Sequence, residues 1–540
     1  MKTTQVLIAG GGPVGLMLAK VLTQFGVKAM LVERNTTTTR YPKMDITNGR
    51  SMELFRRFGL ADDLRKVAVP EHHPFDVSWI TSLAAHELYR FRYPSPEHCR
   101  RLIRETNDGT QSREPGMRVS QVEIEPVLKA AAEANPGASV RFGWTFDDFE
   151  QDETAVTATL RNTEDDATET VRCDYLVGCD GGGSRVRKLL DIALDGAARV
   201  AQRQMVHFRS DAREILQRWG IAWHYQSPFG TLIAQNDKDI WTLHARQNPA
   251  VATDEVDPAA VLRKFAGAAF DHQVLLTSSW TPHLLLARSY GRARVFLAGD
   301  AVHQYIPTGG YGMNTGIGDA VDLGWKLAAT LRGIGGPELL ASYQSERRPV
   351  GLRNREASAG HTKVRLQIGQ SYSNDLEAAL PISGERRAEI SAGIAELGNA
   401  ENESYGIEFG YVYHRSPIVA VEQDIEPPSD PLHYIPTTMP GARLPSTFLK
   451  DGSALFDRLG SWFTLVNFGK SDSGCFATAA KKAGIPLQVL DLDEPSLERV
   501  YGRDALLVRP DQHIAWRVSE HSVVDADRIF ARALGWESVH

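Results

Sequence analysis

A glycine-rich turn between two apolar runs near the N-terminus constrains the fold of this chain more than any other feature. Residues 5–9 form the first apolar run, and Gly10, Gly12 and Gly15 follow it with the spacing G-x-G-x-x-G. A helix-like segment then leads to a second apolar run, which ends at Glu33. A strand, a glycine turn, a helix and a second strand with an acidic end predict a Rossmann-type unit of an α/β fold.

This unit predicts a dinucleotide cofactor. The glycines permit a tight turn and let a pyrophosphate approach the N-terminus of a helix that begins at Pro13. Glu33, followed by Arg34, stands where an acidic residue meets the ribose hydroxyls of the adenosine. The motif alone does not distinguish FAD from NAD, and a glycine-rich turn of an unrelated α/β protein is the simpler alternative.

Residues 294–320 indicate which cofactor it is. The apolar run 295–298 ends at Gly299-Asp300, a loop rich in Gly, Pro and Tyr follows, and a helix signal begins at Met313. Backbone N–H groups and a helix N-terminus placed after a strand end are typical of ligand sites in open α/β sheets. Because a carboxylate there can bind a polyhydroxy chain, the pattern predicts a flavin, with Asp300 on the ribitol and the loop around the isoalloxazine ring.

A second nucleotide fingerprint is absent from the sequence. The segment GCDGGGSRVR, residues 178–187, follows a strand-like run but lacks the G-x-G-x-x-G spacing. If the first site binds FAD, a nicotinamide cofactor has no nucleotide-binding domain of its own. The sequence therefore argues against the architecture of two Rossmann domains found in many flavin disulfide reductases and Baeyer–Villiger enzymes.

Composition excludes several classes of protein. The 540 residues predict two or three domains. A formal net charge of −7 argues against a general electrostatic surface for nucleic acid or for an anionic membrane. No apolar run approaches the roughly 20 residues of a membrane span. The four cysteines form neither a CxxC pair nor a Cys/His cluster with zinc spacing, so we expect free thiols, no metal site and a cytoplasmic location.

Three motifs now stand in order along the chain: Gly10–Gly15 with Glu33, Asp180-Gly181 with Arg187, and Gly299-Asp300. This order resembles the single-component FAD-dependent aromatic hydroxylases, the class that includes p-hydroxybenzoate hydroxylase and phenol hydroxylase. The resemblance covers about residues 1–360 by motif, and the remainder is similar to the phenol hydroxylase and polyketide hydroxylase branch.

The resemblance implies an α/β fold in which a Rossmann-type FAD-binding domain is interleaved with a mixed β-sheet substrate domain. We expect the FAD-binding domain at 1–75, 100–200 and 285–360, the substrate domain at 76–99 and 201–284, a helical segment and Pro-rich connector at 361–445, and a thioredoxin-like domain without CxxC at 446–540. Six prolines between residues 427 and 445 predict a stiff connector rather than a packed element. The last domain is expected to be structural, and a homodimer contact is its alternative role.

The resemblance also implies roles for cofactor-binding residues. Glu33 would bind the adenosine ribose, Gln121 the flavin side of FAD, Asp180-Gly181 both FAD and the nicotinamide donor, Asp300 the ribitol, Pro307 the flavin face, and the backbone of Gly312, Met313 and Asn314 the pyrimidine end of the ring. Lys43 stands where the family usually has an arginine, and it keeps the charge but loses the planar fork. Arg50 of the same motif is retained.

The substrate chemistry is expected near Asp45. Phenol hydroxylases carry an aspartate at this place in the pattern, near the substrate hydroxyl. A carboxylate within hydrogen-bond reach could take the phenol proton directly or through water. The alternative is a loop aspartate that caps a turn.

The alternating segment 205–246 predicts a sheet that covers the substrate pocket. Its polar and aromatic candidates are His207, His224, Tyr225, Trp241 and His244. Strand alternation places His224 and Tyr225 on opposite faces, so at most one of them faces the substrate, and we prefer Tyr225 because a phenol can orient another phenol. A satisfied sheet residue is the alternative for each. In the glycine-rich loop we expect His303 to hold the loop and Tyr311 either to line the site or to fill the loop.

Taken with the resemblance, these features predict an FAD-dependent monooxygenase that hydroxylates a phenolic substrate. NADPH or NADH would reduce FAD, and O2 would react through a flavin C4a-hydroperoxide. A Baeyer–Villiger or epoxidising enzyme acting on a polyketide-like aromatic is one alternative. A non-catalytic flavoprotein is the other, and it predicts slow NAD(P)H oxidation that no phenol stimulates.

Overall fold

The glycine-rich turn lies at one edge of an eight-stranded sheet. The computed structural model describes residues 1–247, 256–378, 381–420, 422, 425–469, 473–518 and 524–537. The strands of this sheet are β1 (Lys2–Ala9), β2 (Ala29–Glu33), β7 (Ala138–Phe142), β8 (Trp144–Gln151), β9 (Val156–Asn162), β10 (Thr168–Gly178), β18 (Gly291–Arg292) and β19 (Val295–Leu297). Their main order is β18-β19-β10-β1-β2-β7, with β9 on β10 and β8 on β9. Because β1, β2, β10 and β19 run parallel, the three motifs that follow β1, β10 and β19 meet at one edge.

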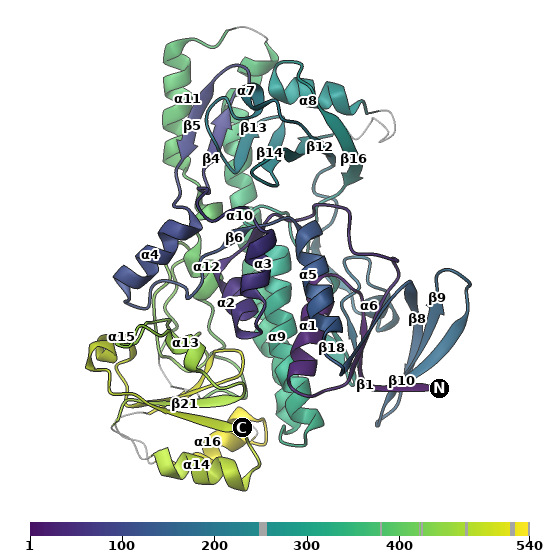
Figure 1. Cartoon of the computed structure of the whole chain (residues 1–540), viewed down its shortest axis with the longest axis vertical. Coiled ribbons are helices and arrows are strands. Elements are labelled where there is room, and N and C mark those ends of the chain that lie inside the picture. Colours follow the sequence, from purple (N-terminus) through teal and green to yellow (C-terminus); the bar gives the residue numbers. More distant parts are fainter. Residues whose placement is uncertain are drawn as a thin grey trace.

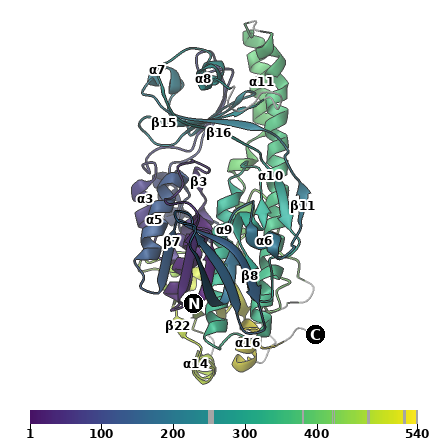
Figure 2. The same cartoon turned by 90° about the vertical axis from the view of Figure 1, so that its right-hand side faces the viewer.

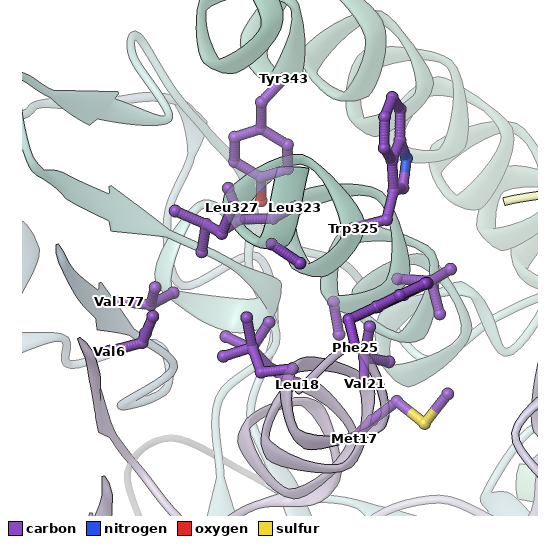
Figure 3. Close-up of a cluster of buried hydrophobic side chains, with 14 of the residues drawn as sticks. Val6, Met17, Leu18, Val21, Phe25, Val177, Leu323, Trp325, Leu327 and Tyr343 are labelled. Atoms are coloured by element: carbon purple, nitrogen blue, oxygen red, sulfur yellow. The ribbon is translucent and has the colours of Figure 1, made fainter. Parts of the chain in front are cut away.

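Two helices form the core beneath this sheet. Helix α1 (Pro13–Gln24) packs against α9 (Tyr311–Leu331), and Figure 3 shows Leu18 and Val21 of α1 beside Leu323 and Leu327 of α9. Gly324 permits this close approach, because a Cβ there would lie 2.5 Å from a methyl carbon of Val21. The core therefore fixes the start of α1 relative to the start of α9, and both starts belong to predicted cofactor motifs.

A second sheet of seven strands lies beyond the first (top of Figure 1). Its order is β16-β12-β15-β14-β13-β4-β5. The strands are β4 (Val77–Ile80), β5 (Glu87–Phe91), β12 (Arg203–Arg209), β13 (His224–Ser227), β14 (Gly230–Ala234), β15 (Ile240–Arg246) and β16 (Gln273–Trp280). They come from two separate segments of the chain, so the sheet is interleaved with the first unit as the resemblance implies. One face packs against α8 (Pro258–Ala266) and α7 (Arg213–Leu216).

One long helix, α10 (Pro337–Glu377), runs from the first sheet to the second, and α11 (Gly384–Leu397) follows it (Figure 2). Shorter helices are α2 (Gly49–Arg57), α3 (Ala61–Val67), α4 (Pro96–Thr106), α5 (Gln121–Glu133), α6 (Arg185–Leu189), α12 (Tyr405–Phe409), α13 (Leu455–Arg458) and α15 (Glu498–Tyr501). Strands β3 (Ile46–Thr47) and β6 (Met117–Arg118) form a pair. A small sheet contains β11 (Leu194–Ala197), β17 (Leu284–Ala287) and β20 (His303–Gln304). Among the described residues, no helix is long and apolar enough to cross a membrane.

The C-terminal sheet has the thioredoxin-like arrangement that the resemblance implies. Its order is β22 (Leu487–Asp491), β21 (Phe463–Asn467), β23 (Ala505–Val508), β24 (Ile514–Arg517). Strand β21 runs parallel to β22 and antiparallel to β23, and α14 (Ser473–Lys482) packs beside α16 (Ala526–Ala533). Figure 1 shows this domain at the lower left, beside the first unit and at the opposite end of the molecule from the second sheet.

The Pro-rich stretch corrects one prediction. It contains no named helix or strand, as expected, yet its second half is packed rather than a free connector. Arg443 is 1% exposed, and its guanidinium contacts both carboxylate oxygens of Glu53 on α2. The rings of Phe409, Tyr434 and Phe456 surround this guanidinium. The prolines set the path of the chain, but the buried ion pair and the aromatic contacts hold it against the first unit.

A buried cluster of charges joins the C-terminal domain to α9 and α10. The guanidinium of Arg509 lies 2.7 Å from Glu346, 3.1 Å from Asp322 and 2.6 Å from Asp511. The ammonium of Lys326 lies 2.6 Å from Glu346 and 2.8 Å from Asp322. Three carboxyl groups and two cations thus share one buried volume, and the loss of either cation would leave buried carboxylates without a partner.

We expect Arg509→Met to destabilise the protein by about 3–5 kcal/mol, because it leaves three buried carboxylates with one cation. The measurement is the concentration of guanidinium chloride at which half of the holoprotein is unfolded. Arg528→Met is the matched control, since Arg528 pairs with Glu537 at the surface with 68% of its side chain exposed and such pairs contribute at most about 1 kcal/mol. Equal midpoints for the two variants would contradict a stabilising role of the cluster.

Candidate active site

The glycine-rich turn after β1 forms a cradle, by which we mean the backbone of residues 10–15. Two glycines of its G-x-G-x-x-G motif have no room for a side chain, whereas the third faces open space. Gly10 has φ +111°, and a Cβ there would lie 2.3 Å from the carbonyl oxygen of Cys179. A Cβ at Gly15 would lie 2.0 Å from the carbonyl oxygen of Gly10. At Gly12, which caps the N-terminus of α1, nothing lies within 4 Å and no side chain caps the helix. The open side of this turn therefore presents a bare helix N-terminus, which favours an anion.

Glu33 ends β2 beside this turn. Its Oε2 accepts a hydrogen bond of 2.8 Å from the backbone N–H of Gly11, and its Oε1 accepts one of 2.9 Å from the N–H of Asn35. The carboxylate is thus held at the edge of the cradle, while Arg34 next to it is exposed. The ribose contact predicted for Glu33 and the cofactor contact predicted for Arg34 stay predictions.

The Asp180-Gly181 motif is tied to the flavin loop. The carboxylate of Asp180 accepts hydrogen bonds from the backbone N–H of Arg185, at 2.6 Å, and of Val186, at 3.1 Å, at the start of α6. Arg187 on α6 donates to the carbonyl oxygens of Gly182, at 3.2 Å, and of Ala301, at 3.0 Å. Arg187 therefore joins the second motif to the third by direct hydrogen bonds.

Asp300 lies in the loop after β19 and is exposed. No described residue donates a hydrogen bond to its carboxylate, and Lys43 lies near enough to act on it electrostatically. The loop itself is held by buried Asp319, which accepts hydrogen bonds from the N–H of Gly299 at 3.1 Å, from Arg347 at 2.8 Å, and shares one of 2.9 Å with His303. His303 thus holds the loop, as the sequence indicates, and Asp300 is left free for a ligand.

The N-terminus of α9 faces the same side. Gly310 caps it with φ 67°, and no side chain caps the helix. Asn314 in its first turn donates to the carbonyl oxygens of Gly310, at 2.6 Å, and Ile46, at 3.3 Å, and accepts a 3.1 Å hydrogen bond from the N–H of Asn48. The side chain of Asn314 therefore fastens the segment around Asp45 to the start of α9, while the Gly312 and Met313 backbone stays at the helix start.

These residues fit FAD. An open glycine turn, an acidic strand end, a free carboxylate at Asp300 and a second bare helix N-terminus lie along one edge of the sheet. Pro307 is exposed in the flavin loop. The contacts of Asp300, Pro307, Gly312, Met313 and Asn314 with a flavin stay predictions.

Two predicted cofactor residues have other partners. Arg50 on α2 is 5% exposed, and its guanidinium donates to Gln512 at 2.6 Å and to the carbonyl oxygen of Asp511 at 2.7 Å. Those hydrogen bonds join α2 to the C-terminal domain, so we drop the FAD contact proposed for Arg50. The amide of Gln121 donates to Glu125 at 2.7 Å and is 9% exposed. Its predicted contact with the flavin side of FAD is untested.

Asp45 is held by the second sheet. Its Oδ2 lies 3.1 Å from Nε2 of His224, the first residue of β13, and accepts a hydrogen bond from the indole N–H of Trp223, which precedes that strand. Burial acts to raise the pKa of this carboxyl, but the His224 and Trp223 contacts and the charge of Arg118 outweigh it and leave the pKa below its usual value. Asp45 is therefore an ionised hydrogen-bond acceptor at neutral pH. Its carboxylate contacts Trp223 and His224 on another segment of the chain and does not cap its own turn.

His224 and Tyr225 do alternate across the sheet, but the preference for Tyr225 is wrong. Tyr225 is completely buried in the core of the opposite face, and its hydroxyl donates to the carbonyl oxygen of Gly220. Trp241 lies in the same core. His224 takes the face toward Asp45. Tyr225 packs with Val206, Leu232 and Leu243. Because these neighbours are hydrophobic, the face that carries Tyr225 is the buried core face and the opposite face carries His224.

The remaining candidates lie around the same face. His207 shares a 2.9 Å hydrogen bond with Thr242, and His244 accepts one of 3.3 Å from Trp280. Tyr311 at the start of α9 is buried and shares a 3.0 Å hydrogen bond with His361 of α10.

Sequence reasoning missed three residues of this site. Trp223 and Arg118 act on Asp45, and Asn48 links its segment to α9. Arg118 stands three positions before Gln121 in the segment that suggested a flavin contact, and Trp223 precedes a candidate histidine, so both lay beside recognised signals. No pattern in the neighbouring sequence indicated that Arg118 or Trp223 lies near Asp45.

Comparisons with known proteins agree with this geometry. A family model described as FAD binding domain matches residues 3–358, and one described as aromatic-ring hydroxylase, C-terminal, matches residues 437–536. The FAD-dependent monooxygenase apdD of Emericella nidulans is 38% identical over 99% of this chain and 91% of its own length. The 2,4-dichlorophenol 6-monooxygenase of Delftia acidovorans is 29% identical over 99% of this chain and 98% of its own.

Solved structures match over the whole length as well. The flavin-dependent monooxygenase PieE in complex with FAD and substrate has a TM-score of 0.89 at 29% identity, with 99% of each chain covered. The rebeccamycin biosynthetic enzyme RebC with reduced flavin has a TM-score of 0.85 at 32% identity, also with 99% of each chain covered. The match extends through the second sheet and the C-terminal domain as well as the glycine motifs.

Proposed function

We propose a function from one premise: this chain belongs to the FAD-dependent aromatic-ring hydroxylases and is an aromatic monooxygenase. On this premise we propose that it hydroxylates a phenolic ring, with O2 as co-substrate and NADPH or NADH as electron donor. When bound, FAD supplies the redox chemistry: it accepts a hydride and delivers one oxygen atom of O2 to the ring. The protein supplies position, charge and exclusion of water.

The chain would hold FAD along the edge that carries the three motifs. The Gly12 turn and the start of α1 would bind the pyrophosphate, Glu33 the adenosine ribose, and Asp300 the ribitol. The start of α9 would place roughly half a positive charge at the pyrimidine end of the ring, which stabilises negative charge there. Asp180-Gly181, tied to the flavin loop through Arg187, would serve both FAD and the nicotinamide donor.

Asp45 would receive the substrate hydroxyl. Its Oδ2 is engaged by Trp223 and His224, and the side chain retains 18% exposure, so Oδ1 is the atom available to a phenol O–H. A carboxylate in this position favours loss of the phenol proton, which activates the ring toward electrophilic oxygen. A proton that reaches the carboxylate is shared with the imidazole, because Nε2 of His224 lies 3.1 Å from Oδ2.

One observation carries the proposal. Asn314 fastens the segment of Asp45 to the start of α9, and His224 fastens Asp45 itself to the second sheet. The group that would bind a phenol and the helix that would face the flavin ring are thus joined by direct hydrogen bonds. The curated relative that acts on 2,4-dichlorophenol supports a phenolic substrate.

The test is a screen of the holoenzyme against simple phenols, resorcinols, salicylates and polycyclic phenols. We expect at least one phenol to stimulate NADPH or NADH oxidation together with O2 uptake. Oxidation that no phenol stimulates would support a non-catalytic flavoprotein. A lactone product would support a Baeyer–Villiger reaction and would remove the hydroxylase proposal.

A further inference from the structure

The face of the second sheet that carries His224 has a regular pattern of rows. The strand register places His224, Ile233, Thr242 and His207 in one row and Gln226, Thr231, His244 and Met205 in the next. Residues two apart on a strand share a face and lie about 7 Å apart. The third row along the same face contains Arg246 on β15 and Arg203 on β12.

Arg203 and Arg246 stand directly opposite each other in the pairing of β12 with β15. Like charges in this relation destabilise a sheet. Among the described residues, neither of these two opposed side chains forms an ion pair with a carboxylate. Arg246 is exposed and Arg203 is half-buried, so water solvates the first charge more fully than the second.

A third arginine reaches the same face from α10. Arg365 lies 3.4 Å from the hydroxyl of Thr231 in the middle row and 2.8 Å from Glu401. The Arg246 guanidinium also approaches α10, at Gly369. Glu401 pairs with Arg365, and the group of three arginines retains an excess of positive charge among the described residues.

The electrostatics agree with the geometry. Burial, together with the charges of Arg246 and Arg365, lowers the pKa of Arg203 to about 10. His244 lies between the arginines and Asp45. Burial lowers the pKa of His244 to about 4. The charge of Asp45 acts to raise this pKa, whereas the charges of His224, Arg203 and Arg365 lower it further. His244 is thus neutral at pH 7 and adds no compensating charge, but it is near enough to both groups to show that they face one space.

We propose that Arg203, Arg246 and Arg365 form a subsite for an anionic group, a carboxylate or an equivalent oxyanion, on the part of the aromatic substrate that lies away from Asp45. Guanidinium groups are suited to this because their planar fork binds an oxyanion through two hydrogen bonds. The proposal rests on the proposed function, since it assumes that the face with Asp45 binds the aromatic ring.

The spacing sets the size of the substrate. Arg246 lies four residues along β15 from Thr242, which is in the row of His224, and four residues of a strand span about 13 Å. Arg365 lies closer, over the middle row. A substrate of two or more rings with an oxyanion at its far end matches this spacing along the sheet better than a single-ring phenol does. The enzyme would therefore select extended aromatic acids over small neutral phenols.

The test uses a rigid probe, 4'-hydroxybiphenyl-4-carboxylate, whose phenol oxygen and carboxylate lie about 11 Å apart by covalent geometry. Its methyl ester has the same rings and the same phenol without the charge. Binding of each probe to the holoenzyme is measured by isothermal titration calorimetry, so the result does not depend on turnover. We expect the acid to bind at least about tenfold more tightly than the ester, as hydrogen bonds to a charged group predict.

Arginine variants locate the effect. We expect Arg203→Gln and Arg365→Gln each to raise the Kd of the acid about tenfold and to leave the Kd of the ester within about twofold. Arg209→Gln is the matched control, because Arg209 lies on β12 and on the same face but pairs with Asp239 at 3.1 Å. That variant should change neither Kd. Equal binding of acid and ester by the parent enzyme, no binding of the acid, or equal losses for both probes would overturn the proposal.

Stability supplies a second readout that a purely structural role would not give. If the arginines are kept for a ligand, Arg203→Gln removes a repulsion, and the Tm of the holoenzyme without probe should stay the same or rise. A fall in Tm would show that Arg203 supports the fold and would contradict the proposal. Failure of the proposed function is seen separately, as phenols that do not stimulate NAD(P)H oxidation, and it leaves the two Kd values free to be compared.

Discussion

Gly12→Val is expected to raise the Kd for FAD by at least about 100-fold, because each lost hydrogen bond between a backbone N–H and a charged oxygen costs about 1.5–3 kcal/mol. The backbone at Gly12 has φ −74°, which any residue adopts, and nothing lies within 4 Å of a Cβ built there. The valine side chain would therefore occupy the space that the pyrophosphate needs and would not strain the protein. FAD binding is measured by fluorescence titration of the apoprotein.

The control for this variant separates the cradle from the fold. Gly393→Val adds the same atoms on α11, where a Cβ also has nothing within 4 Å, and it should leave FAD affinity unchanged. Gly10→Val, in contrast, would strike the carbonyl of Cys179 and should lower the stability of the apoprotein. Normal FAD affinity in Gly12→Val would show that the pyrophosphate lies elsewhere.

Asp45→Asn is expected to lower the hydroxylation rate by about 100-fold or more, within the range of a lost general base, while FAD stays bound. The amide has the shape of the carboxylate and can still accept hydrogen bonds from Trp223 and His224, but it cannot accept a proton from a phenol. The measurement is the rate of product formation against the rate of NAD(P)H oxidation, with FAD content checked by absorbance.

The dependence on pH distinguishes a base from a structural residue. The pKa of Asp45 lies below its ordinary value, so the parent enzyme should keep an ionised Asp45 from pH 6 to pH 8. In Asp45→Asn the phenol must ionise on its own, with a pKa of about 10, so the rate of the variant should rise with pH and recover in part. Asp239→Asn, at a half-buried site in the turn between β14 and β15, should show no such rise. An unchanged rate in Asp45→Asn would remove Asp45 from the mechanism.

The fold could be predicted from the sequence because its signals are local. The turn at Gly10 needs a positive φ and a close approach to Cys179, and both requirements appear in the sequence as glycines with fixed spacing. The order of the three motifs then indicated the family. The resemblance to that family predicted the second sheet and the thioredoxin-like domain. The comparisons confirm the family and the fold.

The substrate side could not be predicted as well, because it depends on which face each strand buries. Alternation separated His224 from Tyr225, but only packing with Leu232 and Leu243 decides that Tyr225 belongs to the core. Arg50 fits a family motif, and yet two of its partners, Asp511 and Gln512, come from the C-terminal domain, more than 450 positions away in the sequence. Contacts at that separation leave no pattern that a single sequence displays.

The most direct test of the central claim is the product of one turnover under isotopically labelled O2 with a phenol that stimulates NAD(P)H oxidation. If the chain is a phenol hydroxylase, mass spectrometry and NMR will show one labelled oxygen atom bonded to an intact aromatic ring, adjacent or opposite to the original hydroxyl. A labelled lactone, a labelled epoxide or a phenol recovered without label would contradict it.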